Sequence, residues 1–224
     1  GSKSLAISAV FQIRATLSGT YYGTITASAN ITLDSIPRAS SVSAANMTMG
    51  SAGTISISRA SSAFTHTLTY SFGNTSGTIA TKTTATSVSW TPALSLASQI
   101  PNATSGTCTI TCTTYNGNTN IGSKTCTLTL SVPASVKPTI SSLTASRIDG
   151  EVPSTWGIYV QTKSKVKLTI NGAAGSNGST IKSYSITGGG YSGSASTLTT
   201  GFLNNSGTIT FKATVTDSRG RVSA

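Results

Sequence analysis

Residues 106–113 read Gly-Thr-Cys-Thr-Ile-Thr-Cys-Thr, and residues 125–132 read Thr-Cys-Thr-Leu-Thr-Leu-Ser-Val. Both stretches alternate polar with apolar side chains. This is the pattern of a β-strand with one buried face, because successive side chains of a strand point to opposite faces. The segment between them, residues 115–122, is rich in Asn and Gly, which tolerate the positive φ angles of a hairpin turn. The two stretches therefore predict an antiparallel β-hairpin.

The pattern returns about 100 residues further along the chain, a spacing typical of immunoglobulin-like domains. Residues 105–110 read Ser-Gly-Thr-Cys-Thr-Ile, and residues 206–211 read Ser-Gly-Thr-Ile-Thr-Phe. A repeat of this length has room for about seven short strands. No stretch shows the 3.6-residue period of a helix, and we expect at most a helical turn in residues 92–100. The predicted fold class is all-β, with tandem immunoglobulin-like antiparallel β-sandwiches.

Proline-containing segments mark the expected domain boundaries. They are Ile-Pro-Arg at residues 36–38 and Val-Pro-Ala-Ser-Val-Lys-Pro at residues 132–138. Proline ends a strand and stiffens a short linker. We therefore expect a partial N-terminal β unit at residues 1–35, an immunoglobulin-like sandwich at 36–133, and a second sandwich at 134–224 that lacks most of its last strand.

The N-terminal unit has the pattern of a β-hairpin. Apolar residues alternate from Leu5 to Phe11 and again over residues 25–33, with a turn at residues 18–20. A two-stranded hairpin alone is marginal in water. We expect this hairpin to be the part of a truncated upstream β domain that this chain retains.

The closing strand of the last unit is short. Residues 124–132 follow the turn in the central unit, whereas only residues 221–224 follow the corresponding turn at Asp217. An unpaired strand edge exposes backbone amides and carbonyls. This leaves three alternatives: the edge takes the N-terminal hairpin of a neighbouring chain, two edges pair symmetrically, or the hairpin packs on its own central unit and the edge stays in water. The first two predict self-association.

Positive charge exceeds negative charge, because the chain has 15 Lys and Arg residues against 4 Asp and Glu, a net charge of +11. The clustered basic and aromatic residues of a nucleic-acid interface are missing, so we expect no nucleic-acid partner. Lys163, Lys165 and Lys167 alternate along a predicted strand. They form a row that either protects an edge or meets an anionic surface. No apolar run approaches the ~20 residues of a membrane-spanning helix, and we expect no membrane partner.

Catalytic groups are scarce. Residues 36–133 contain no Asp or Glu, and Asp149 and Glu151 lie in a loop-like segment. The only histidine, His66, falls on the apolar side of its strand and is expected to be a hydrogen-bonded core or rim residue. No Gly-x-Ser-x-Gly motif occurs. We expect no catalytic residue, no cofactor and no enzyme activity.

Three cysteines lie on the predicted hairpin. Cys108 and Cys112 are four residues apart on one strand, or about 13 Å, too far for a disulfide or a shared zinc ion. Cys126 on the partner strand reaches only one of them. We expect three reduced core thiols and no metal site, with one cross-strand disulfide as the alternative.

Two tyrosines are candidates for a ligand surface. Tyr191 lies in the glycine-rich segment 188–194, where a ring has little to pack against, and Tyr115 precedes the Asn-rich turn. Trp90 and Trp156 lie in strand-like contexts and are expected in the cores. At the last turn, we expect the Asp217 side chain to bond the turn amides, with the nearby arginines in solvent.

A resemblance rests on four segments of this sequence. They are Leu-Ser-Gly-Thr-Tyr-Tyr-Gly at residues 17–23, Leu-Asp-Ser-Ile-Pro-Arg-Ala at 33–39, Phe-Thr-His-Thr-Leu at 64–68 with Gly73, and Thr-Asp-Ser-Arg-Gly-Arg at 216–221. Together they resemble a family of structural (tail or tip) proteins of unknown function from siphophages of Gram-positive bacteria. The resemblance implies a place in the virion tail, tandem immunoglobulin-like domains, other tail proteins as partners and contact with the host surface. It brings no active site.

The leading functional hypothesis is therefore a non-enzymatic tail protein that serves as a spacer or decoration. Host attachment would use cell-wall polysaccharide or teichoic acid. Two alternatives remain at this point: the repeat region of an extracellular bacterial surface adhesin, and the carbohydrate-binding accessory part of a larger hydrolase.

Overall fold

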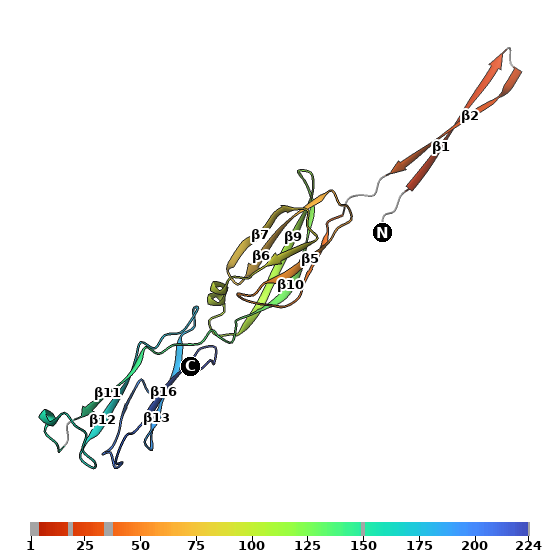
Figure 1. Cartoon of the computed structure of the whole chain (residues 1–224). Helices are drawn as coiled ribbons and strands as arrows, with labels where there is room; N and C mark the ends of the chain where they lie inside the picture. The colour runs from red at the N-terminus through yellow and green to blue at the C-terminus, as the bar shows by residue number, and fades with distance from the viewer. Residues whose placement is uncertain (1–4, 18–19, 34–37, 149–150, 224) are drawn as a thin grey trace.

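The computed structural model describes residues 5–17, 20–33, 38–148 and 151–223, and for residues 5–33 only the backbone pairing is used. Figure 1 shows an N-terminal hairpin followed by two groups of strands that lie end to end. We call the group β3–β10 the first sandwich and the group β11–β16 the second sandwich. The boundary expected between residues 35 and 36 lies outside the described residues, which do not include residues 34–37.

The N-terminal hairpin pairs β1 (Leu5–Leu17) with β2 (Thr20–Leu33) antiparallel, with an irregularity between Arg14 and Thr16. The two strands form a two-stranded sheet of their own. The expected turn at residues 18–20 lies mostly outside the described residues.

The first sandwich has two sheets. One has the strand order β3-β5-β8, and the other has the order β4-β10-β9-β6-β7. A short 3₁₀ helix, η1 (Leu94–Gln99), follows β8 in the segment where a helical turn was expected. The strands are β3 (Ser41–Ala44), β4 (Met47–Thr48), β5 (Gly53–Ser58), β6 (Phe64–Phe72), β7 (Thr75–Thr83), β8 (Ser87–Trp90), β9 (Ser105–Asn116) and β10 (Thr119–Ser131).

The hairpin predicted from the alternating threonines is β9–β10. These strands pair from Asn116 with Thr119 to Ser105 with Ser131, and Gly117 takes a positive φ of 58° in the turn. Cys108, Ile110 and Cys112 of β9 face inward and are fully buried. The core also contains side chains from both sheets, such as Ile55, Leu68, Phe72, Leu128 and Leu130.

The second sandwich is smaller. One sheet has the order β11-β12-β15 and the other has β14-β13-β16. Its core is a separate cluster that includes Val166, Leu168, Ile186, Leu203 and Val215. The strands are β11 (Ser142–Ile148), β12 (Lys165–Asn171), β13 (Ile181–Gly188), β14 (Tyr191–Gly193), β15 (Thr197–Thr199) and β16 (Phe211–Asp217), with a 3₁₀ turn η2 (Ser154–Trp156).

The strand orders of the two sandwiches correspond. β11-β12-β15 matches β3-β5-β8, and β16-β13-β14 matches β9-β6-β7, so the predicted all-β fold of tandem sandwiches is confirmed. Within the described residues, the second sandwich has no equivalent of β10. β16 is therefore an edge strand, with a single bridge between Thr216 and Val222 beside it.

Candidate functional site

The turn after β16 is organised by a buried aspartate. Asp217 is fully buried, and its Oδ1 atom accepts the backbone N–H groups of Arg219 at 3.0 Å and Arg221 at 2.9 Å. The N–H of Gly220 donates to the carbonyl oxygen of Asp217 at 2.9 Å, and Gly220 takes a φ of 79° that a residue with a side chain rarely adopts. The expected role of Asp217 as a turn cap is confirmed.

The expectation that the arginines lie in solvent is wrong. Arg219 is only 7% exposed. Its Nη2 atom donates to the carbonyl oxygens of Ala97 and Asn177, each at 2.7 Å, and its Nη1 atom donates to Ser176 O at 2.7 Å. Nε donates to Ile100 O at 3.3 Å. Burial lowers the pKa of the Arg219 guanidinium, and the nearby Asp217 charge acts in the opposite direction.

These acceptors lie on both sandwiches. Ala97 belongs to η1, which stands at the end of the first sandwich that faces the second (Figure 1). The neighbouring Ser218 also bonds across the junction between the sandwiches, because its Oγ atom donates to Pro101 O at 2.6 Å. The turn of the second sandwich is therefore docked on the end of the first.

Arg221 ties the same turn to the linker. Its Nη2 atom donates to Val132 O at 2.7 Å, and its Nη1 atom donates to Val136 O at 2.9 Å and to Pro133 O. Val136 itself is buried in the core cluster of the first sandwich. Sequence reasoning missed this junction because the acceptors are backbone carbonyls, which leave no residue signature.

The far end of the second sandwich carries exposed apolar side chains. Trp156 is 60% exposed, Ile158 55% and Tyr159 49%. The prediction of a core position for Trp156 is wrong, because residues 151–164 form an irregular connection that contains η2 rather than a strand. Trp90, by contrast, is partly buried and contacts the Tyr70 ring, with 5.1 Å between ring centroids.

Hydrogen bonds from Arg147 and an ion pair hold this connection in place. Arg147 of β11 donates from Nη1 to Ile158 O at 2.7 Å and from Nη2 to Pro153 O at 2.8 Å. Lys163 and Glu151 form an ion pair whose side chains are about half exposed. The exposed aromatic residues therefore sit on a braced loop.

A cavity of 260 Å³ opens beside Tyr159. It lies between the two sheets, next to the beginning of β16. Apolar side chains dominate its lining, which comprises Ala145, Tyr159, Val166, Leu203, Gly207, Thr208, Ile209 and Phe211.

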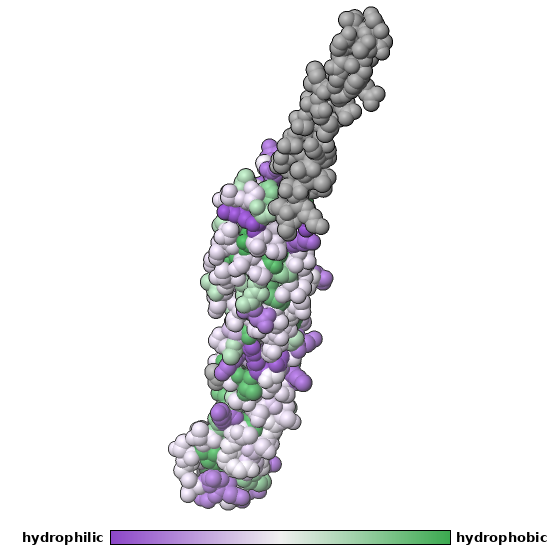
Figure 2. All heavy atoms as spheres, turned by 90° about the vertical axis from the view of Figure 1, so that its right-hand side faces the viewer, coloured by the Kyte–Doolittle hydropathy of each residue, from purple (hydrophilic) through white to green (hydrophobic). Residues whose placement is uncertain are grey.

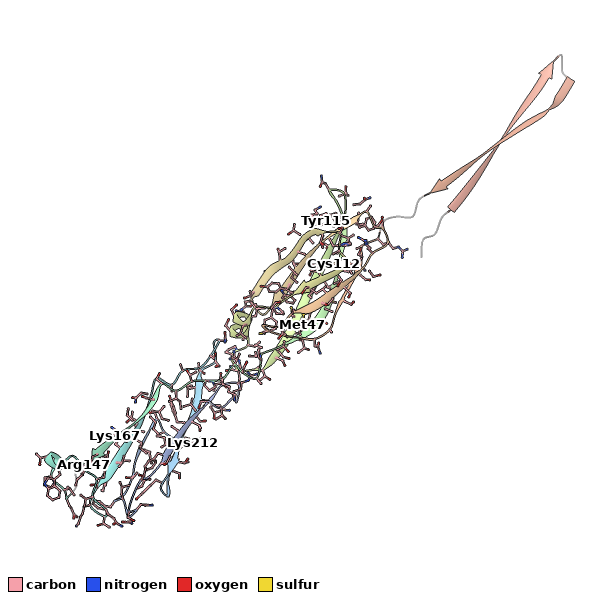
Figure 3. All side chains as sticks on the ribbon, in the orientation of Figure 1. Met47, Cys112, Tyr115, Arg147, Lys167 and Lys212 are labelled. Carbon is pink, nitrogen blue, oxygen red and sulfur yellow. The ribbon has the colours of Figure 1, made fainter. Side chains whose placement is uncertain are left out.

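The residues predicted as a ligand surface do not form one site. Tyr191 lies in β14, packs against the second core and donates its hydroxyl to Phe202 O at 2.9 Å. It is thus better packed than its glycine-rich segment suggested. Tyr115 lies at the other end of the first sandwich from the second (Figure 3), with Lys82 Nζ 3.3 Å from its ring centroid.

The three lysines that the sequence suggested as a binding row lie in different environments. Lys165 and Lys167 lie on the outward face of β12, and Lys165 Nζ is 4.6 Å from the Phe202 ring centroid. Lys163 precedes the strand and pairs with Glu151. Their part in binding remains a proposal.

The single histidine is buried with its hydrogen-bond partner. His66 Nε2 lies 2.8 Å from Ser40 Oγ, yet both residues are enclosed, so no substrate reaches this pair. Burial lowers the pKa of His66. The role predicted for His66, a hydrogen-bonded core residue, is confirmed.

The thiols are free, as predicted. Cys108 and Cys112 are buried and Cys126 is partly buried. Cys126 lies opposite Ile110 rather than opposite either cysteine. Burial raises the pKa of Cys108 to about 11 and also raises that of Cys112 and Cys126. In the described part of the chain, no group of three or more His, Cys, Asp or Glu side chains is placed to hold a metal ion.

Fold and junction together define a tandem immunoglobulin-like β-sandwich protein. The chain belongs to the family described as siphovirus protein of unknown function (DUF859), whose family model matches residues 1–224. This confirms the resemblance to siphophage proteins. A comparison with curated proteins gives no match. No helix in the described ranges has the length and apolar character needed to cross a membrane.

Solved structures with similarity to this chain are multidomain β proteins. The fibronectin(III)-like modules of Clostridium thermocellum CbhA share 14% identity, with 82% of this chain and 90% of that chain covered and a TM-score of 0.28. The FN1–FN3 domains of chicken CNTN1 share 10% identity, with coverage of 97% and 74% and a TM-score of 0.31. A group of titin domains shares 16% identity, with coverage of 97% and 72% and a TM-score of 0.34.

Proposed function

We propose that this chain is a non-enzymatic structural protein of the phage tail in which linked sandwiches act as a spacer. The observation that carries the proposal is the junction made by Asp217, Arg219 and Arg221. A spacer has to hold its domains at a fixed angle, whereas domains within one chain move relative to one another unless their interface is substantial.

The junction supplies such an interface with charged donors. Hydrogen bonds to charged groups contribute about 1.5–3 kcal/mol each, and Arg219 alone makes four bonds to carbonyl oxygens. Both sandwiches also present a surface that suits a passive element. The face in Figure 2 is mostly near neutral in hydropathy, with small purple and green areas. Family membership favours a virion protein over a bacterial adhesin or a hydrolase accessory domain.

The location can be tested on virions. Antibodies raised against this chain and visualised by immunogold electron microscopy should label the tail. A matched labelling experiment with antibodies against a capsid protein provides the control. Labelling confined to the capsid, or none on intact and partially disrupted particles, contradicts the proposal.

Host attachment is a second candidate function, favoured by the exposed Trp156 and Tyr159 at the end of the second sandwich. Exposed aromatic rings provide flat apolar faces, and Lys165 and Lys167 add positive charge on the nearby strand β12. Cell-wall polysaccharide and teichoic acid are the two ligand classes, and Tyr191 and Tyr115 are the further residues predicted from the sequence.

Binding to purified host cell walls tests this function. Contacts with teichoic acid should weaken steeply with salt, because exposed charges are screened beyond ~8 Å at physiological ionic strength. Lys165→Ala with Lys167→Ala should reduce such binding, whereas Trp156→Ala should reduce salt-resistant binding to polysaccharide. Lys124→Ala, at an exposed position of β10 in the first sandwich, is the control. Walls that retain none of the unmodified chain contradict host attachment.

A further inference from the structure

The outer face of the sheet β4-β10-β9-β6-β7 is a lattice of hydroxyl side chains. On β6, β9 and β10, the residues that alternate with the buried core residues are almost all Thr or Ser. The registers of the central strand β9 and its neighbours place these residues side by side. Two rows each cross four strands: Ser76, Ser71, Thr109 and Thr127 form one row, and Thr78, Thr69, Thr111 and Thr125 form the other.

This face carries very little charge. The charged residues of strands β4, β6, β7, β9 and β10 are Lys82 and Lys124. Lys124 lies between Ser123 and Thr125, so it belongs to the opposite side of β10. Surfaces of soluble domains normally mix charged side chains of both signs. A face of hydroxyls suits a neutral ligand that brings hydroxyls of its own, because a Thr hydroxyl both donates and accepts hydrogen bonds.

The hydroxyls in the middle of this face are free to bind. In the described part of the chain, the side chains of Thr69, Thr111 and Thr125 make no hydrogen bond with another residue. Neighbouring hydroxyls lie about 4.8 Å apart across the strands and about 6.6 Å apart along them. A ligand with a repeating unit can therefore meet several of these hydroxyls at once.

An aromatic ring stands at one end of the lattice. Tyr115 follows Thr111 and Thr113 on the same face of β9, at the end of the first sandwich that lies away from the second (Figure 3). Lys82 Nζ lies 3.3 Å from the ring centroid and donates to Gly117 O. Lys82 has a φ of 48°, which is uncommon for a residue with a side chain.

This backbone conformation has a use at a binding site. Strained residues cluster where a ligand is held, because the surrounding structure has to maintain them. Here the strained Lys82 holds its ammonium group on one face of the Tyr115 ring and so fixes the orientation of that ring. An oriented aromatic ring offers a flat apolar surface, against which the apolar side of a sugar ring can pack.

We propose that this face binds an extended neutral polysaccharide of the host cell wall. One sugar ring packs against Tyr115, and the following units bind the threonine rows. Such a site rests on the host attachment proposed above, names its ligand class and lies apart from Trp156. Teichoic acid fits this face less well, because Lys82 is its one cation among the described strands of the sheet.

Binding of the whole chain to purified host cell walls, from which teichoic acid has been extracted, tests this inference. The unmodified chain should bind, and salt should change the affinity little because no ion pair is needed. A variant with three Val substitutions keeps the side-chain shapes and removes a row of hydroxyls: Thr69→Val, Thr111→Val and Thr125→Val. Its affinity should fall about tenfold or more, because three hydrogen bonds are lost.

The matched control removes three exposed hydroxyls from the opposite sheet and should bind like the unmodified chain: Thr54→Val, Ser56→Ala and Ser89→Ala. If the Val variant has a changed melting temperature, single substitutions replace it. Thr111→Lys places a long charged side chain in the middle of the face and should abolish binding, whereas Ser56→Lys should not. Tyr115→Ala should also weaken binding, and Tyr115→Phe should retain it because the ring remains.

Two outcomes overturn the inference and leave host attachment standing. One is a chain that binds complete walls but not the extracted walls. The other is binding to extracted walls that Trp156→Ala removes and the threonine variants do not change. A chain that binds neither kind of wall contradicts both this inference and host attachment.

Discussion

The Nη2 atom of Arg219, in the second sandwich, lies 2.7 Å from the carbonyl oxygen of Ala97, in the first sandwich. Ala97 is fully buried in the first core cluster, so the guanidinium reaches the interior end of the neighbouring domain. This single bond links the turn after β16 to the helix η1, and the other bonds of Arg219 and Arg221 surround it. The turn after β16 thus contributes directly to the relative position of the sandwiches.

Replacement of Arg219 should loosen the junction. Arg219→Ala removes four hydrogen bonds from a charged donor to carbonyl oxygens, and we expect a loss of about 2 kcal/mol or more in the free energy of unfolding. Arg219→Lys should recover little, because an ammonium group lacks the planar set of donors of a guanidinium. Small-angle X-ray scattering should show a broader range of end-to-end distances. Lys212→Ala, an exposed position on β16, is the control.

Asp217 offers a graded test of the same turn. Asp217→Ala removes the oxygen that accepts the N–H groups of Arg219 and Arg221, and should cost about 1–3 kcal/mol because buried donors are left unsatisfied. Asp217→Asn keeps an oxygen at this position and should cost less. Chemical denaturation of the two variants measures the difference. Equal stability of Asp217→Ala and the unmodified chain would contradict the role assigned to this side chain.

The alternation of residues 106–113 and 125–132 was enough to predict β9 and β10, because one buried face imposes a period of two on a strand. The offset repeat at residues 206–211 likewise predicted a second sandwich. It could not predict that β16 begins only at Phe211, because the length of a strand depends on partners that the motif does not contain.

The site was less predictable for two physical reasons. Arg219 and Arg221 bind backbone carbonyls, and any residue can supply a carbonyl, so the sequence identifies only the donors. Trp156 was placed in the core on its apolar character, but whether a large apolar residue is buried depends on how the chain connects β11 to β12. The tertiary arrangement decides both cases.

The two tryptophans should differ in their effect on stability. Trp90→Ala should lower the free energy of unfolding by about 2–3 kcal/mol, because the ring fills space between partly buried neighbours. Trp156→Ala should change it by less than about 0.5 kcal/mol, as is usual for exposed side chains. Urea denaturation measures both. A large loss for Trp156→Ala would show that this residue is packed after all.

Thiol reactivity should separate the folded from the unfolded chain. Burial raises the pKa of Cys108 to about 11, so its reactive thiolate is scarce near neutral pH. A thiol reagent should react fastest with Cys126, which is only partly buried, and slowly with Cys108 and Cys112. After denaturation, all three thiols should react. One free thiol instead of three would indicate a disulfide.

The pH dependence of stability should report on His66, whose pKa burial lowers in the folded chain. The unfolded chain takes up a proton near pH 6.5, whereas the folded chain resists protonation. The unfolded state therefore binds more protons below this pH, and stability is full above about pH 6.5 and falls as the pH drops, by at most about 1.4 kcal/mol per pH unit. Residues 36–133 contain no Asp or Glu whose titration would mask the effect. His66→Gln should flatten the profile between pH 5 and 7 in urea titrations, compared with Lys82→Ala as a surface control. A slope that is the same in His66→Gln would assign the pH dependence to another group.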